Sequence, residues 1–324
     1  MIDTSLYPLK FTPILKEKIW GGSKLKEFFN KEREGKIGES WELSGVKGDI
    51  SIVSQGKLKN KSIDELIAIY GSELLGKKVA KQYGTQFPLL FKYIDAAEDL
   101  SVQLHPDDAL AKERHDSFGK TEMWYIMQAE ADARLLLGFN DGVDQKSYAR
   151  HISENNIVGI IKAEAVTEGD SFFLAPGTVH AIGAGIVLAE IQQTSDITYR
   201  IYDWDRPGLD GNMRDLHTED ALAAIKFDAP DARLRYIRNE KGVTSICESP
   251  YFRTSKINCI SQIDLDYSKV DSFIVYMCVG GKATIKTSNT ATQIKKGETL
   301  LIPACFDQIS ILTENAEILE VYIP

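Results

Sequence analysis

Short runs of alternating apolar and polar residues dominate the first two thirds of the chain and predict β-strands. Each run is rich in β-branched or aromatic residues and is bounded by Gly, Pro, Asp or Asn. The predicted strands cover residues 86–94, 100–105, 122–128, 133–137, 171–175, 186–192 and 198–202. Many short strands of this kind are typical of an antiparallel sandwich or barrel.

Four stretches in the same part of the chain have the spacing of helices. In the segment 62–83, Ser62 stands three residues before Glu65, which is the pattern of a capping box, and apolar residues follow at helical spacing. Pro106 occupies a favoured first position for a helix over 106–116. We expect two further helices, over 145–161 and over 218–225, the last capped by Thr218.

Beyond residue 238 the pattern indicates strands alone. They are predicted over residues 253–260, 272–279, 282–286, 299–302, 308–312 and 318–323. We therefore expect a first domain over 1–238, which contains the helical segments, and a small all-β domain over 239–324. A chain of 324 residues is long enough for two domains of ordinary size.

Composition narrows the possible partners. The formal net charge is −9 with scattered acidic residues, which argues against broad binding of nucleic acid but allows a local Lys and Arg cluster for a small anion. We expect no membrane span and no signal peptide, because the chain lacks a run of about 18 apolar residues and a basic, then apolar, start. The four cysteines, Cys247, Cys259, Cys278 and Cys305, form no CxxC pair, and we interpret them as reduced, mostly buried thiols of a cytoplasmic protein.

The segment LSVQLHPDD carries the first candidate chemistry. Alternation along a strand places Ser101, Gln103 and His105 on one face and apolar residues on the other. A polar face on an otherwise apolar strand suggests a barrel with a functional interior. Gln103 and His105, two residues apart, could both reach one metal ion.

Two later segments supply further candidate ligands. In GKTEMWYIM, Glu122 shares a face with Lys120, and a carboxylate in an apolar strand needs a positive partner, either that lysine or a metal ion. In EGDSFFLAPGTVHAIGAG, the spacing from Gly169 to His180 fits the second signature of the cupins, with Ala175 in place of the usual proline. Together with Gln103 and His105, these residues would give two imidazoles, a carboxylate and an amide oxygen.

Several charged residues stand in apolar strands. Arg200 could bind a phosphate through two parallel hydrogen bonds or stabilise a developing oxyanion. Glu190 and Lys92 also interrupt apolar runs. Taken singly, each candidate has a structural interpretation, such as a hydrogen-bonded histidine or a paired ion. The joint interpretation is stronger, because two parts of the cupin pattern, in LSVQLHPDD and in EGDSFFLAPGTVHAIGAG, occur in the expected order.

Three other histidines, His115, His151 and His217, are interpreted as surface residues without partners.

These segments resemble a known family. LSVQLHPDD, GKTEMWYIM, PGTVHAIGAG and EIQQTSDITYRIYDWDR, together with KEKIWGG and GESWELS, are similar to the short bacterial form of type I mannose-6-phosphate isomerases, from about residue 11 to residue 206. The resemblance implies a mainly β fold of two cupin domains, which are jelly-roll β-barrels, with a small helical portion.

The resemblance also implies the roles of individual residues. It implies one zinc ion per chain, held by Gln103, His105, Glu122 and His180. It further implies that Arg200, Glu190 and Lys120 line the active site and that Ser101 and Lys92 lie near the substrate phosphate. Trp20 falls in a motif near the site, with an otherwise unassigned role.

The second domain departs from the cupin pattern. Cys305 stands where the turn glycine is expected, Gln308 stands where the ligand histidine is expected, and no histidine follows His217. We therefore expect a degenerate cupin domain without metal, with a structural role.

The resemblance implies that the reaction is the interconversion of mannose 6-phosphate and fructose 6-phosphate through an enediol(ate). Three proton carriers remain open: Glu190, which is slightly preferred, Lys120 and a metal-bound water.

One alternative function is that of a non-catalytic sugar-binding cupin, such as a sensor. Another is a different metal cupin enzyme, for example an iron-dependent dioxygenase. A purely structural β-sandwich would require the inward polar residues to be accidental. The partner is expected to be a small sugar phosphate, and the chain to be a monomer or weak homo-oligomer.

Overall fold

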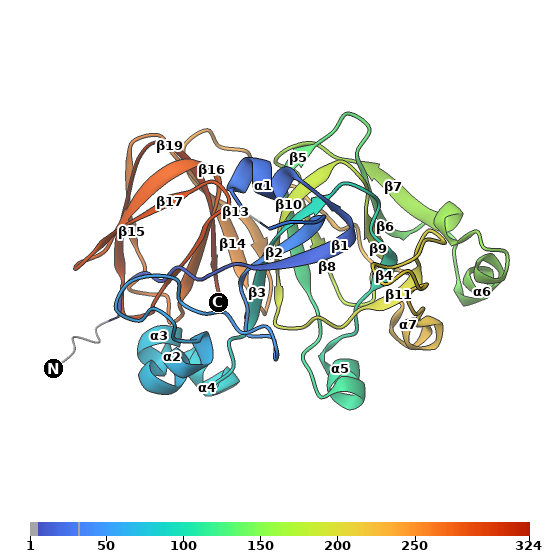
Figure 1. Ribbon diagram of the computed structural model, residues 1–324, viewed down its shortest axis with the longest axis horizontal. Helices are drawn as coiled ribbons and strands as arrows, with labels where there is room; N and C mark the ends of the chain where they lie inside the picture. The colour runs from blue at the N-terminus through green and yellow to red at the C-terminus, as the bar shows by residue number, and fades with distance from the viewer. Residues whose placement is uncertain (1–5, 32) are drawn as a thin grey trace.

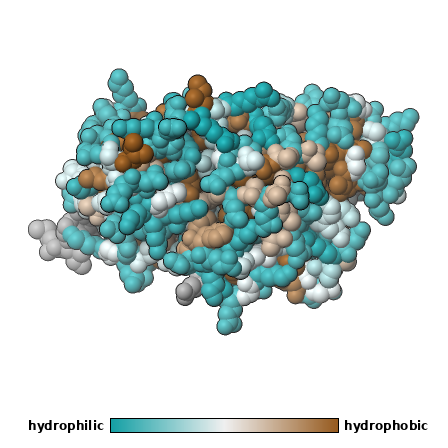
Figure 2. Space-filling view, turned by 90° about the horizontal axis from the view of Figure 1, so that it is seen from above, coloured by the Kyte–Doolittle hydropathy of each residue, from teal (hydrophilic) through white to brown (hydrophobic). Residues whose placement is uncertain are grey.

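The computed structural model describes residues 6–31 and 33–324. Three antiparallel sheets build two β-rich halves that lie side by side (Figure 1). The prediction of a mainly β fold with a small helical portion is confirmed. The face of the molecule in Figure 2 is largely hydrophilic, and its exposed apolar residues occur in small groups.

Two sheets make up the N-terminal half. The first contains, in spatial order, β1 (Ile14–Gly22), β2 (Ile37–Leu43), β3 (Leu89–Ala96), β10 (Ile186–Gln193), β5 (Glu122–Ala129), β8 (Ser171–Leu174) and β12 (Arg233–Leu234). The second contains β11 (Tyr199–Tyr202), β4 (Val102–Leu104), β9 (His180–Ile182), β6 (Arg134–Phe139) and β7 (Ile161–Ala165). Strands β3 and β10 are buried at every residue, which shows that both faces of the first sheet are covered there.

The third sheet forms the C-terminal half. Its strands are β13 (Gly242–Glu248), β14 (Arg253–Cys259), β19 (Gln308–Tyr322), β16 (Ile274–Lys286) and β17 (Ala291–Lys295), with β15 (Gln262–Asp266) on β19 and β18 (Thr299–Ile302) on β16. Two pairs of predicted strands are each one long strand here, β16 and β19. These two strands pair with each other across a register shift at Gly280, so the apparent breaks in the sequence pattern are bulges and not turns.

The segment 62–83 is not one helix, as the sequence predicted, but three: α2 (Ile63–Tyr70), α3 (Ser72–Leu75) and α4 (Lys77–Tyr83). Gly71 and Gly76 separate them with φ angles of 49° and 89°. A right-handed helix cannot continue through positive φ, and glycine adopts it without a steric penalty. The capping box of Ser62 and Glu65 is confirmed.

The other helices differ from the predictions mainly at their ends. Helix α5 (Asp108–His115) begins later than predicted, because the side chain of Asp107 caps it. Only the first part of 145–161 is α-helical, as α6 (Gln145–Ser153), and a 3-10 turn follows (Ile157–Ile160). Helix α7 (Thr218–Ala224) has His217, not Thr218, at its N-cap, and α1 (Lys24–Phe29) was not predicted.

Early segments of the chain pack against the C-terminal sheet. The backbone of Leu75 in α3 accepts a hydrogen bond from Phe273 N at 3.1 Å, and Leu74 O accepts one from Ala304 N at 3.0 Å. Leu9 forms an antiparallel bridge with Leu301. One apolar core therefore runs through both halves. The boundary between two domains at residue 238 remains a prediction from the sequence.

The described structure also shows the state of the cysteines and the character of the helices. Cys247, Cys259 and Cys278 are buried, whereas Cys305 is exposed. Among the described residues, none of the helices combines the length and the apolar character that crossing a membrane requires.

Candidate active site

Three predicted ligands converge in the N-terminal half. His105 follows β4, Glu122 begins β5 and His180 begins β9, so the two sheets bring them together. One donor atom of each lies within 4.8 Å of the others, and all three residues are buried. The Nε2 atoms of His105 and His180 lie 3.5 and 3.4 Å from the carboxylate oxygens of Glu122.

Both histidines are oriented by backbone carbonyls. His105 Nδ1 lies 2.8 Å from Ile197 O, and His180 Nδ1 lies 2.9 Å from Thr178 O. A carbonyl only accepts hydrogen bonds, so each Nδ1 carries the hydrogen and each Nε2 presents a lone pair to the site. Burial lowers the pKa of His105 well below its ordinary value and that of His180 to about 4, so both rings are neutral at neutral pH.

The cluster has the properties of a cation site. Oε1 of Glu122 and Nε2 of His180 are buried and make no hydrogen bond, whereas Oε2 of Glu122 forms an ion pair with Lys120. Burial raises the pKa of Glu122 to about 7, against the opposing charge of Lys120, whose Nζ lies 3.2 Å from Oε2. Unpartnered buried polar atoms are costly, and a metal ion would satisfy them. Two imidazoles and a carboxylate are also a common donor set for zinc, so the residues fit the metal.

Gln103 lies beside this cluster. Its Cα pairs with that of His180 on β9 and with that of Arg200 on β11. Register partners project from the same face of a sheet, so the three side chains are neighbours. Gln103 Oε1 accepts a hydrogen bond from Ser101 Oγ at 3.1 Å. The strand register thus places the Gln103 side chain on the same face as His180, next to the cluster.

The opposite wall is a row of side chains across the first sheet. Register pairs place Trp41, Lys92, Glu190 and Trp124 next to one another on β2, β3, β10 and β5. Glu190 accepts hydrogen bonds from Lys92 Nζ at 2.7 Å and from Trp124 Nε1 at 2.9 Å. Although burial raises the pKa of Glu190, Lys92 and Lys120 outweigh it and hold the pKa below its ordinary value. Glu190 is thus an ionised carboxylate with both oxygens engaged.

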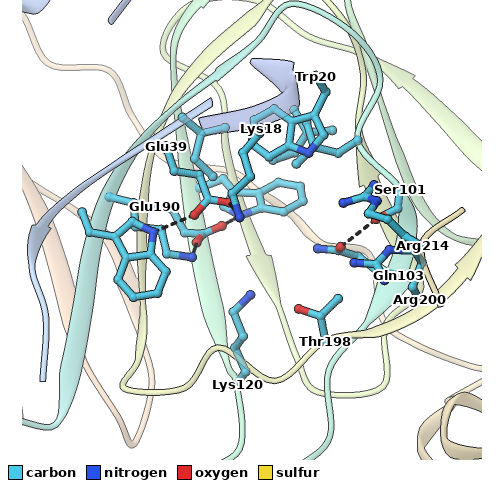
Figure 3. Close-up of a pocket in the computed structure, with 16 residues that line it drawn as sticks. Lys18, Trp20, Glu39, Ser101, Gln103, Lys120, Glu190, Thr198, Arg200 and Arg214 are labelled. Carbon is cyan, nitrogen blue, oxygen red and sulfur yellow. Dashed lines mark hydrogen bonds and ion pairs between the residues drawn. The ribbon is translucent and has the colours of Figure 1, made fainter. Parts of the chain in front are cut away.

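A cavity of about 110 Å³ lies between these walls (Figure 3). It is lined by the predicted site residues Trp20, Lys92, Ser101, Gln103, Lys120, Glu190 and Arg200. Its lining also includes residues that the sequence analysis did not select, among them Lys18, Glu39, Trp41 and Arg214. Five cations line the pocket: Lys18, Lys92, Lys120, Arg200 and Arg214. Lys120 connects the pocket to the ligand cluster, because its Nζ lies 3.0 Å from His105 Nε2 and 3.2 Å from Glu122 Oε2.

Comparisons with known proteins assign the chain to a family. Residues 8–131 match the catalytic domain of type I phosphomannose isomerases, and residues 243–323 match the cupin domain of mannose-6-phosphate isomerases. The chain is 33% identical to mannose-6-phosphate isomerase ManA of Bacillus subtilis, over 91% of this chain and 93% of that protein. The chain belongs to the type I mannose-6-phosphate isomerase family.

Two further comparisons support membership of the isomerase family. A mannose-6-phosphate isomerase of Streptococcus mutans is 31% identical over 91% of this chain and 92% of its own length. The crystal structure of mannose 6-phosphate isomerase from Bacillus subtilis superposes with a TM-score of 0.88 at 29% identity, covering 98% of this chain and 99% of that one. The predicted cupin fold is thereby confirmed.

Within this isomerase fold, Trp20 and the following glycines hold β1 against β2. The carbonyl of Trp20 accepts hydrogen bonds from Ala97 N and Glu98 N, at 3.0 and 3.1 Å. A Cβ on Gly21 would lie 2.4 Å from Gly38 N, so only glycine permits this close approach. These contacts fix the Trp20 side chain in the pocket wall.

Lys120 is bracketed by a hydrogen-bond network that reaches the C-terminal half. Gly119 N donates to Asp108 Oδ1 and Thr121 N donates to Gln193 Oε1, each at 2.9 Å. Gln193 Nε2 also donates to Asp108 Oδ1 at 2.9 Å, and Tyr251 OH donates to Asp108 Oδ2 at 2.7 Å. The C-terminal half thus contributes one hydroxyl to the frame around Lys120.

His115 is exposed, as predicted, and His217 is half-buried, but the prediction that they have no partners is wrong. His217 Nδ1 accepts a hydrogen bond from Arg200 N at 3.2 Å, and His217 N donates to Arg200 O at 2.7 Å. His217 therefore fixes the backbone of a pocket residue. His115 Nε2 lies 2.7 Å from Tyr199 OH. His151 lies on α6 and contacts its neighbour Arg150.

The C-terminal half has a different interior. Gln308, at the position of the missing histidine, is exposed and donates to Asp266 Oδ1 at 2.8 Å. Inside this half, the hydroxyl of Tyr267 contacts that of Tyr276 at 2.6 Å and donates to the buried carboxyl of Glu320. Strand pairing places Tyr276 directly opposite Glu320.

Some of the pocket residues that the sequence analysis did not select could have been found from the sequence pattern, and others could not. Lys18, Glu39 and Trp41 lie in KEKIWGG and GESWELS, and the alternation of Glu39 and Trp41 along β2 would have placed them on one face. Arg214 lies in a connection without regular structure, between β11 and α7, where no periodicity indicates direction.

Proposed function

We propose that this chain interconverts mannose 6-phosphate and fructose 6-phosphate. The observation that carries the proposal is the convergence of His105, Glu122 and His180 beside a pocket lined by cations. Such a pocket offers a Lewis-acid position for the reacting end of a sugar and positive charge for its phosphate. Membership of the isomerase family supports the same reaction.

We propose that the chain binds one zinc ion, with His105, Glu122, His180 and Gln103 as ligands. The lone pairs that both histidines present on Nε2 and the unpartnered Oε1 of Glu122 support this assignment. When bound, zinc would polarise an oxygen of the substrate and make the neighbouring C–H proton easier to remove.

Arg200 and Lys120 are the residues that we propose to act on the reacting atoms. Arg200 lies beside Gln103 and is positioned to stabilise negative charge on a substrate oxygen. The sequence slightly favoured Glu190 as the proton carrier, but both its oxygens already accept hydrogen bonds. The Lys120 side chain extends into the pocket, with Nζ 3.0 Å from His105 Nε2 (Figure 3). Lys120 is therefore the preferred proton carrier, and Glu190 fixes the wall formed by Lys92 and Trp124.

Ser101, Lys92 and Trp20 are proposed to shape the substrate site. Ser101 reaches the pocket and orients the Gln103 amide. Lys92 is neutralised by Glu190 and is 5% exposed, which leaves it less available to a phosphate than the sequence suggested. The location in the cytoplasm and the oligomeric state stay predictions from the sequence.

A coupled assay on the purified protein tests the proposed function. Fructose 6-phosphate should form from mannose 6-phosphate, activity should disappear after treatment with a chelator, and added zinc should restore it. A sugar-binding sensor would bind the sugar phosphate without forming product. A metal cupin oxygenase would consume oxygen with its own substrate and leave mannose 6-phosphate unchanged. Either result would replace the isomerase proposal.

A further inference from the structure

Arg200 lies in the edge strand of the second sheet, and its backbone is nevertheless bound on both sides. On one side Arg200 pairs with Gln103 of β4, and the two side chains lie next to each other (Figure 3). On the other side, no strand of the described residues continues the sheet beyond β11, and His217 occupies that place. His217 N donates to Arg200 O at 2.7 Å, and Arg200 N donates to His217 Nδ1 at 3.2 Å.

These two hydrogen bonds resemble the pairing of antiparallel strands. In such a ladder, a hydrogen-bonded residue engages both its N–H and its C=O with the residue opposite. The C=O of Arg200 receives a backbone N–H, as in a ladder, but its N–H is received by a side chain. The imidazole of His217 thus replaces the carbonyl that a neighbouring strand would supply.

The same contact determines which atom of the ring is needed. A backbone N–H can only donate, so His217 Nδ1 presents a lone pair and the hydrogen of the neutral ring is on Nε2. The accepting atom is bonded to Cγ. The amide oxygen of asparagine is also bonded to Cγ, whereas that of glutamine lies one carbon further from the backbone. Asparagine can therefore place an acceptor at the position of Nδ1, and glutamine cannot.

The side chain of Arg200 depends on the same segment of the chain. Its Nη1 donates to Asp215 O at 2.9 Å, and its Nε is buried without a hydrogen-bond partner. Residues 215–217 thus hold Arg200 at two points, the guanidinium through a carbonyl and the backbone through His217. Neither contact involves a carboxylate, so both position the cation without neutralising its charge.

His217 is itself fixed to the protein by the helix that it begins. It is the N-cap residue of α7, where Ala221 N donates to His217 O at 2.8 Å. Ala221 is fully buried in an apolar cluster that includes Tyr199 and Ile201 of β11. A residue that positions another must have its own orientation fixed by packing and hydrogen bonds. Helix α7 gives the imidazole that support.

We propose that His217 is a positioning residue for the isomerisation: its neutral imidazole accepts the Arg200 N–H and thereby holds the Arg200 guanidinium at the reacting end of the pocket. The inference rests on the proposed isomerase function and on the role proposed there for Arg200. That role is to stabilise charge that develops in the transition state, so His217 should support turnover more than substrate binding.

Steady-state kinetics of three variants tests the need for the acceptor. His217→Leu removes it, and kcat for mannose 6-phosphate should fall about 5- to 10-fold, as for loss of one hydrogen bond, with KM within about twofold of the wild type. His217→Asn should keep most of the wild-type kcat, and His217→Gln should resemble His217→Leu. Equal losses in the Asn and Gln variants, or wild-type kcat in His217→Leu, would overturn the proposal. The comparison of Asn with Gln remains decisive if His217→Leu does not fold.

Amide hydrogen exchange separates this proposal from the isomerase reaction, because it needs no turnover. The Arg200 amide should exchange about 10-fold faster in His217→Gln than in the wild type and should stay protected in His217→Asn. His151→Leu is the matched control, with no change in kcat or in this exchange rate, because His151 lies on α6 outside the pocket. Unchanged exchange in His217→Gln would contradict the proposal. If exchange followed the expected order but the wild type did not isomerise the sugar, the isomerase proposal alone would fail.

Discussion

Lys92 Nζ lies 2.7 Å from Glu190 Oε1, and the two residues are direct register partners on β3 and β10. Both side chains are buried, with 6% and 4% of their surface exposed. The sequence placed one near the phosphate and the other at the proton transfer. The pairing makes each the main electrostatic partner of the other, which is the reason that we prefer other residues for those two roles.

Breaking this pair should be more harmful than removing it. Lys92→Met leaves the Glu190 carboxylate buried without its ammonium and should lower the free energy of unfolding by about 3–5 kcal/mol. Lys92→Met combined with Glu190→Gln should recover much of that loss, since no unpaired charge remains. Urea unfolding of the wild type, both single variants and the double variant measures this. Additive losses in the double variant would show that the two residues are not coupled.

Arg200→Ala tests the proposed stabilisation of negative charge. The turnover number should fall about 100- to 1,000-fold, as for loss of a group that stabilises an oxyanion, while the zinc content stays the same. Steady-state kinetics and metal analysis on the same preparation give both quantities. Arg114, which pairs with Asp220 away from the pocket, provides the control Arg114→Ala with near-normal turnover. Near-normal turnover in Arg200→Ala itself would reject the role of Arg200.

Tyr251→Phe tests whether the C-terminal half positions Lys120. Removing the hydroxyl deletes the hydrogen bond to Asp108 and should lower kcat about fivefold, as expected for about 1 kcal/mol, with KM unchanged. Tyr236→Phe is a matched control, because that hydroxyl donates to Gly169 O away from the pocket. A change in KM alone, or an equal effect in the control, would speak against positioning of Lys120.

Glu320 should give the stability of the protein a measurable pH dependence. Burial raises the pKa of this carboxyl above its ordinary value, against hydrogen bonds from Tyr267 and Ser255. The folded state therefore holds the proton more tightly than the unfolded chain. The resulting stability is fully present below the unfolded pKa and is lost as pH rises through the folded pKa.

The variant Glu320→Gln cannot titrate and should lack this dependence. Relative to the wild type, it should become progressively more stable as pH is raised from mildly acidic to neutral values. Urea unfolding of both proteins across that range measures the difference. A constant difference at every pH would mean that Glu320 has the same pKa in the folded and unfolded chain.

The parts of the site that the sequence predicted are those with local signals. Strand alternation placed Gln103 and His105 on one face, and the spacing from Gly169 to His180 predicted the second imidazole. Glu122 was recognisable because a carboxylate in an apolar strand requires a partner. These patterns involve residues that are close together along the chain, so they can be recognised in a single sequence.

The parts that the sequence did not predict depend on distant contacts. The hydrogen bond from Tyr251 to Asp108 joins residues 143 positions apart, and no local pattern indicates it. Arg214 lies in an irregular connection, where no periodicity indicates the direction of a side chain. Its guanidinium is oriented by a hydrogen bond to the buried carboxylate of Asp203. The breaks at Gly71 and Gly76 were readable as glycines, but the packing of Gly76 against the backbone of Asp271 in the C-terminal half was not.

The central claim is that four side chains of the first half bind one metal ion. Crystals grown with zinc and measured at the zinc absorption edge should show one anomalous peak per chain. It should lie about 2.0–2.2 Å from Nε2 of His105, Nε2 of His180 and oxygens of Glu122 and Gln103. A peak away from these atoms, or none in protein that is fully active, would contradict the account.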